Sequence, residues 1–167
     1  MKRAPDSFDE LLTPSLQNQQ TDPASGSRPW SVGSQVWVAF FGGIFAVTAI
    51  AYLNGRRLGL PPSRQRMILL CGSVSFLSLC ALAYGLAAWF GVADTQAIRL
   101  SGRGVALLTF LAAAALQKSA ARTYSFYNGE ETASLWKAGI AATLGLGFLQ
   151  GIVLGIVLMV LAPGMFR

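Results

Sequence analysis

The feature that most limits how this chain can fold is a set of long stretches without any charged side chain. Residues 36–53, 67–90 and 138–161 are uncharged and almost continuously apolar. A helix rises 1.5 Å per residue, so about 20 residues cross the roughly 30 Å hydrocarbon core of a bilayer. The sequence therefore predicts a membrane-spanning helix in each of these three stretches. The last one should end before Pro163 and Gly164, where a helix cannot easily continue.

A fourth stretch, residues 104–117, is also uncharged but shorter, which leaves a short span, a re-entrant segment or an interfacial helix as alternatives. On a helical wheel the flanking basic residues share one arc, but Leu107 and Leu111 lie in that same arc. The middle of this helix is therefore apolar on all sides, unlike that of an interfacial helix. We favour a span over residues 101–121 whose basic ends snorkel to the surface, with the helix continuing toward Tyr127.

Composition agrees with a membrane protein, because only 12% of residues are charged, against about 25% in ordinary soluble domains. We predict an all-α integral membrane protein, a four-helix transmembrane bundle over residues 34–167, preceded by a disordered tail over residues 1–33. The tail is rich in Pro, Ser, Gln and Asp and has few large apolar residues. Within it, Phe8, Leu11 and Leu12 have helical spacing and could dock on a partner; the alternative is a fully solvated tail.

The orientation in the membrane is predicted from the loop after the first stretch. This loop carries Arg56, Arg57, Arg64 and Arg66 and no acidic residue, which places it in the cytoplasm by the positive-inside rule. With four spans, both chain termini would then lie on the opposite side of the membrane. If residues 101–121 do not span, the C-terminus would lie inside. Short arginine-flanked spans favour a bacterial cytoplasmic membrane.

Small residues recur at every fourth position of the last stretch: Gly139, Thr143, Gly147, Gly151 and Gly155. Gln150 falls on the same helical face, about 20° from Gly139 around the helix. In lipid, helix association depends on close backbone approach and interhelical hydrogen bonds, so these residues form a predicted helix-packing surface. It could pack on another span of the same molecule or on a partner. Because the strip covers roughly 160° of the helix, it could contact two neighbours.

The sequence offers little for chemistry. The predicted spans have no ionisable side chain in their uncharged cores and the chain has no His, so we predict no catalytic, cofactor-binding or metal-binding residues, and no enzyme. The dispersed basic residues form no nucleic-acid patch. We expect an accessory, scaffold or assembly subunit that contacts lipid and other membrane subunits or a second copy. The alternative is a homo-oligomeric channel or carrier lined by Ser73, Ser75, Ser78, Thr109, Thr143 and Gln150.

Overall fold

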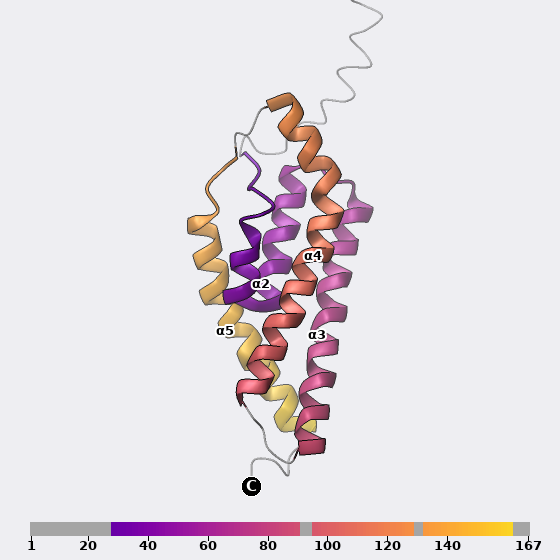
Figure 1. The fold of residues 1–167 in the computed structure, drawn as a ribbon, viewed down its shortest axis with the longest axis vertical. Helices are drawn as coiled ribbons and strands as arrows, with labels where there is room; N and C mark the ends of the chain where they lie inside the picture. Colours follow the sequence, from indigo (N-terminus) through magenta and orange to yellow (C-terminus); the bar gives the residue numbers. More distant parts are fainter. Residues whose placement is uncertain (1–27, 91–94, 129–131, 162–167) are drawn as a thin grey trace, which may run out of the picture.

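The computed structural model describes residues 28–90, 95–128 and 132–161, and almost all of these residues are helical. The helices are α2 (Gln35–Arg57), α3 (Pro62–Phe90), α4 (Thr95–Asn128) and α5 (Trp136–Leu161), arranged as an elongated bundle (Figure 1). Counted from its first to its last residue, each is long and apolar enough to be a candidate membrane span. The all-helical architecture and the four apolar helices agree with the sequence prediction and suggest a multi-pass membrane protein.

Three of the predicted spans lie within single helices of the structure. Residues 67–90 form most of α3, residues 101–121 lie inside α4, and residues 138–161 lie inside α5. α4 continues without interruption to Asn128 and is therefore longer than the predicted span. The predicted helix 36–53 is the one that differs in shape.

α2 is two helices joined by a break at Gly43. This residue has φ 76° and ψ −165°, which lies far from helical geometry and in a region that is essentially restricted to glycine. Residues 35–42 before the break form a segment about 12 Å long, and residues 44–57 after it form one about 21 Å long. Neither segment alone reaches across about 30 Å of hydrocarbon.

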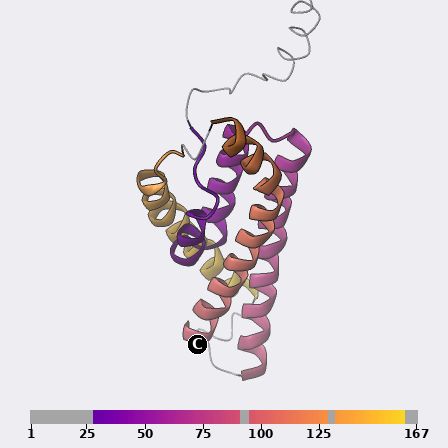
Figure 2. The same ribbon diagram turned by 45° about the horizontal axis from the view of Figure 1, so that its top comes forward.

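The two segments of α2 fold back on each other. Val38 and Ile50 belong to one buried cluster, although a straight helix would separate them by about 18 Å. Gln35 and Asn54 both donate to the side-chain oxygen of Gln117, although a straight helix would hold them about 28 Å apart. The ribbon shows the same path, with the indigo start of α2 descending into the bundle and its later part returning to the same end (Figures 1 and 2).

The fold-back corrects the expected arrangement of the tail. Four straight spans would put the start of the first helix and the arginine loop on opposite sides of the membrane. In the structure, a guanidinium N–H of Arg57 instead donates to the backbone carbonyl of Arg28 at 3.2 Å. The same guanidinium lies 3.7 Å above the centre of the Trp30 ring. The end of the tail and the arginine loop therefore lie side by side, and the prediction that separated them is wrong.

This end of the molecule also holds the start of α3, the end of α4 and the start of α5. The Ala133 amide donates to the Pro29 carbonyl at 2.9 Å, and a guanidinium N–H of Arg64 donates to the Ser119 hydroxyl at 2.8 Å. We call it the basic end, because most basic side chains of the described residues lie in or next to it: Arg28, Arg56, Arg57, Arg64, Arg66, Lys118, Arg122 and Lys137. Arg99 and Arg103 lie in the first turns of α4, toward the other end.

α2 forms the core of the bundle and packs against α3, α4 and α5. Its buried residues include Ile44, Val47 and Ala51. α5, in contrast, buries very little of its apolar surface inside the molecule. Many large apolar side chains of α3 and α5 are exposed, as expected where the surrounding solvent is lipid.

Candidate functional site

The break in α2 lies directly against α5. The side-chain oxygen of Gln150 accepts a hydrogen bond of 3.0 Å from the backbone N–H of Phe45, just after the break. A break inside a helix frees backbone groups, and in an apolar environment each unsatisfied group costs several kcal/mol. Gln150 therefore supplies the acceptor that the interrupted helix lacks. A long polar side chain in the middle of an apolar helix is explained by this contact.

Small residues on both helices allow this close approach. A Cβ atom added to Gly42 would lie 2.9 Å from the hydroxyl oxygen of Thr143, and one added to Gly147 would lie 3.1 Å from the Gly42 carbonyl oxygen. At Gly43 a Cβ would lie 2.7 Å from the side-chain oxygen of Gln150. Any larger side chain at these positions would push α2 and α5 apart.

The small-residue strip of α5 is thus divided. Gly139, Thr143, Gly147 and Gln150 face α2, where Val38 approaches Gly139 and Gly42 approaches the next two. A Cβ added to Gly151 or Gly155 would meet nothing within 4 Å in the described structure. The strip therefore has an inner part, which packs inside the molecule, and an outer part of two glycines that nothing in the described structure covers.

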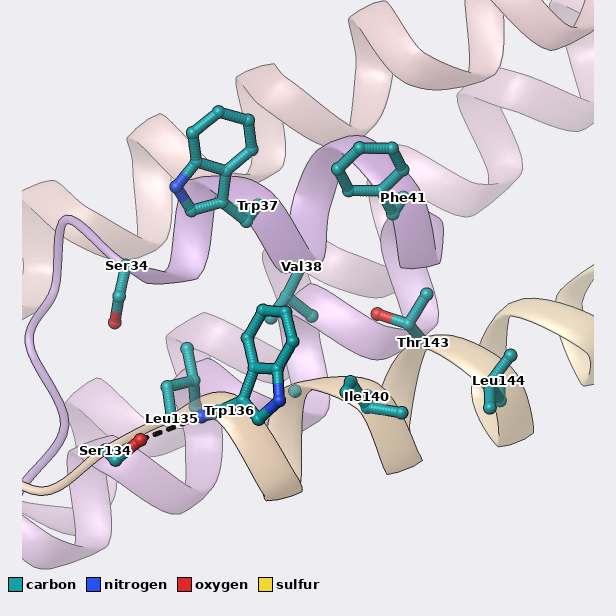
Figure 3. Close-up of a pocket in the computed structure, with 11 residues that line it drawn as sticks. Ser34, Trp37, Val38, Phe41, Ser134, Leu135, Trp136, Ile140, Thr143 and Leu144 are labelled. Atoms are coloured by element: carbon teal, nitrogen blue, oxygen red, sulfur yellow. Dashed lines mark hydrogen bonds between the residues drawn. The ribbon is translucent and has the colours of Figure 1, made fainter.

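Between the first segment of α2 and α5 lies an apolar groove of about 590 Å³ (Figure 3). Trp37 and Phe41 stand on its α2 side, and Trp136 and Ile140 stand on its α5 side. Thr143 reaches from α5 toward α2 at its inner edge. The groove is lined almost entirely by apolar side chains, so lipid or another apolar helix face could contact it.

Near the basic end, three buried amides lock the fold-back. The side-chain oxygen of Gln117 on α4 accepts from Asn54 at 2.8 Å and from Gln35 at 3.3 Å, and its N–H₂ group donates to the Ala51 carbonyl at 3.3 Å. The Asn54 oxygen accepts from the Trp30 amide at 2.7 Å. All three amide side chains are at most 1% exposed. This amide cluster joins both segments of α2 to α4.

Sequence reasoning missed the amide cluster. It ended the first span at residue 53 and treated Gln117 only as the limit of an uncharged stretch, so Asn54 and Gln117 carried no role. A signal was present, because the uncharged run from residue 29 to residue 55 contains Gly42 and Gly43 near its middle and an amide near each end. Glycine-interrupted apolar segments are typical of broken or re-entrant helices.

Four of the six side chains of the alternative polar path make contacts within one copy: Ser78, Thr109, Thr143 and Gln150. Ser78 and Thr109 donate to carbonyls one turn back in their own helices, at Val74 and Val105. Thr143 and Gln150 lie together at the α2 break. Neither of the two grooves detailed in the described structure includes Ser73, Ser75 or Ser78 among its lining residues.

The other predicted residues are placed as follows. Arg56 and Arg66 are exposed at the basic end, and Arg57 and Arg64 bond to neighbouring elements there. Phe8, Leu11 and Leu12 lie outside the described residues. Within the described part of the chain, no group of His, Cys, Asp or Glu is arranged to hold a metal ion.

Comparison with protein-family models, with curated proteins and with solved structures found no match.

Proposed function

We propose that this protein is an accessory or assembly subunit that binds a transmembrane helix of a partner, or of a second copy, through the outer face of α5. The observation that carries the proposal is the division of the glycine strip. The inner part is occupied by α2, whereas Gly151 and Gly155 lie open.

Two open glycines in a helix call for an explanation. A glycine in a helix interior costs about 1 kcal/mol of stability relative to alanine. Two glycines on a lipid-facing surface therefore weaken the helix, and no packing contact among the described residues compensates for this cost. Around them stand large exposed apolar side chains, including Phe148, Ile152 and Met159. These five positions follow helical spacing and form one face. A shallow glycine track between large apolar side chains allows the close approach on which helix association in lipid depends.

The polar side chains of the bundle support a structural role better than a transport role. Gln150 completes the broken α2, and the amide cluster ties α2 to α4. The described residues include no carboxylate and no histidine, the groups that most proton and ion pathways use. The alternative hypothesis of a channel or carrier is not supported by contacts of this kind among the described residues.

We further propose that the basic end faces the cytoplasm of a bacterial cell, in the cytoplasmic membrane. The positive-inside rule supports this side, since most basic residues lie there. With α2 folded back, α3, α4 and α5 are the helices left to cross. Arg28 and Trp30, which contact Arg57, would then lie on the cytoplasmic side.

The test uses substitutions that the isolated chain can accommodate. Gly151→Leu and Gly155→Leu add side chains where nothing lies within 4 Å, so the fold of one copy should persist. Gly147 is unsuitable, because its Cβ would meet the Gly42 carbonyl. Gly104→Leu is the matched control: its position is also open, but it lies on α4, away from the outer face of α5.

The tagged protein and its variants are purified from the native membrane in gentle detergent, and their native masses are measured. We expect the wild type and Gly104→Leu to keep the same partner or oligomer, and Gly151→Leu and Gly155→Leu to lose it. An unchanged complex in all variants would contradict the proposal. Solute flux in liposomes from the protein alone would support the channel instead.

A further inference from the structure

A second groove, independent of the α5 face, runs along α4 at the basic end. It has a volume of about 850 Å³ and is bounded by α4 on one side and by residues 29–33 on the other. Leu111, Ala114, Ala115, Lys118 and Arg122 line it, and their spacing of three and four residues places them on one face of α4. The groove is therefore a continuous track along one helix.

The track is divided by chemistry along its length. The part farther from the basic end is lined by the apolar side chains of Leu111, Ala114 and Ala115. The two alanines have small side chains, so they leave this part of the groove open. Its outer part has Lys118 and Arg122, one helical turn apart and both exposed. These two residues follow directly on the uncharged stretch 104–117, so a bilayer centred on that stretch would place them near the lipid phosphate groups.

Nothing in the described structure neutralises these two cations. Every Asp and Glu of the chain falls outside the described residues, and the basic side chains nearby only add to the positive charge of this end. Lys118 and Arg122 therefore form a cationic rim above an apolar track. A ligand that matches both parts must carry an anion at one end and a hydrocarbon chain at the other.

We propose that this groove binds an anionic phospholipid of the cytoplasmic leaflet. The phosphate accepts hydrogen bonds from the Arg122 guanidinium and the Lys118 ammonium, and one acyl chain lies along Leu111, Ala114 and Ala115. The Arg fork suits two phosphate oxygens, and Lys118 adds a point charge. A soluble phosphate would use the rim but not the apolar track, which is why the lipid is the better match.

The test measures lipid retention by the full-length protein. Protein extracted from bilayers of equal parts phosphatidylglycerol and phosphatidylcholine is analysed by native mass spectrometry, and retained lipids are counted by class. We expect selective retention of phosphatidylglycerol, weakened about fivefold for each charge removed in Lys118→Gln and Arg122→Gln. The matched control, Arg56→Gln with Arg66→Gln, removes two exposed cations of the same end that do not line the groove. It should retain phosphatidylglycerol like the wild type.

Further variants separate the proposal from other causes. Ala115→Phe keeps both cations but fills the apolar track, so it should also lower retention; this variant decides the outcome if the charge variants fail to fold. Equal retention of both lipid classes, equal loss in the Arg56 and Arg66 control, or full competition by soluble glycerol phosphate would each overturn the proposal.

Discussion

We expect Gly43→Ala to destabilise the protein more than the same substitution at a glycine that lies in a turn or faces open space. The φ of 76° and ψ of −165° at Gly43 fall in a region where a side chain costs of order 1–3 kcal/mol. The added Cβ would also lie 2.7 Å from the Gln150 oxygen, which must then move away. The Phe45 N–H would lose its acceptor, adding about 1–3 kcal/mol. The expected total is about 2–6 kcal/mol.

Two alanine substitutions separate these contributions. Gly59→Ala also introduces a side chain at positive φ, 66°, but its Cβ would meet nothing within 4 Å, so it should cost about 1–2 kcal/mol. Gly151→Ala adds a methyl group to an open helical position and should be neutral, or stabilising by up to about 1 kcal/mol. The free energy of unfolding of each variant is measured by reversible denaturant titration in mixed micelles.

A cost of Gly43→Ala no greater than that of Gly59→Ala would contradict this prediction. A double-mutant cycle gives a second check, because part of the Gly43→Ala cost should arise through Gln150. In a Gln150→Ala background the Phe45 N–H has already lost its acceptor, so Gly43→Ala should cost about 1–3 kcal/mol less than in the wild type. Strict additivity would show that Gln150 does not respond to the break.

Three further predictions follow from the same contacts. Gln150→Leu should lower the free energy of unfolding by about 1–3 kcal/mol, and the exposed Leu149→Gln serves as a control for polarity; equal effects would contradict the acceptor role. Gln117→Leu should cost about 2–5 kcal/mol, because it leaves buried amide donors of Asn54 and Gln35 unpaired; a loss below 1 kcal/mol in the same titration would argue against the amide cluster. In a chain without Cys71 and Cys80, an impermeant maleimide added to intact cells should label Gln96→Cys but neither Ser31→Cys nor Ser63→Cys. Labelling of only one of Ser31→Cys and Ser63→Cys would place the two ends of α2 on different sides of the membrane and would contradict the fold-back.

The positions of the apolar helices could be read from the sequence because a charge-free length is a local property. α3 and α5 follow directly from the uncharged residues 67–90 and 138–161. α4 was harder, since its uncharged part is short, yet the leucines among its basic residues indicated a helix that is apolar on all sides. The strip on α5 was also local, because a four-residue repeat specifies one helical face whatever lies opposite.

The shape of α2 could not be read in the same way. Its break depends on the backbone of one residue, Gly43, and on Gln150, the acceptor for the Phe45 N–H, which lies 105 positions after Phe45. In an apolar helix, glycines also serve ordinary packing, so Gly42 and Gly43 alone do not indicate a reversal. The split of the α5 strip into inner and outer parts follows from that reversal. Only the three-dimensional contacts reveal which glycines are already occupied.

The most direct test of the fold-back is a distance across α2 in lipid. Spin labels are attached at the exposed positions Ser31 and Ser63, which flank α2, in a chain without Cys71 and Cys80, and the distance distribution is measured by pulsed electron paramagnetic resonance in nanodiscs. A straight α2 would separate its ends by about 33 Å. The structure predicts a single distribution centred well below that value, with both labels at the basic end. A distribution centred at or above about 33 Å would contradict the fold-back and restore α2 as a crossing helix.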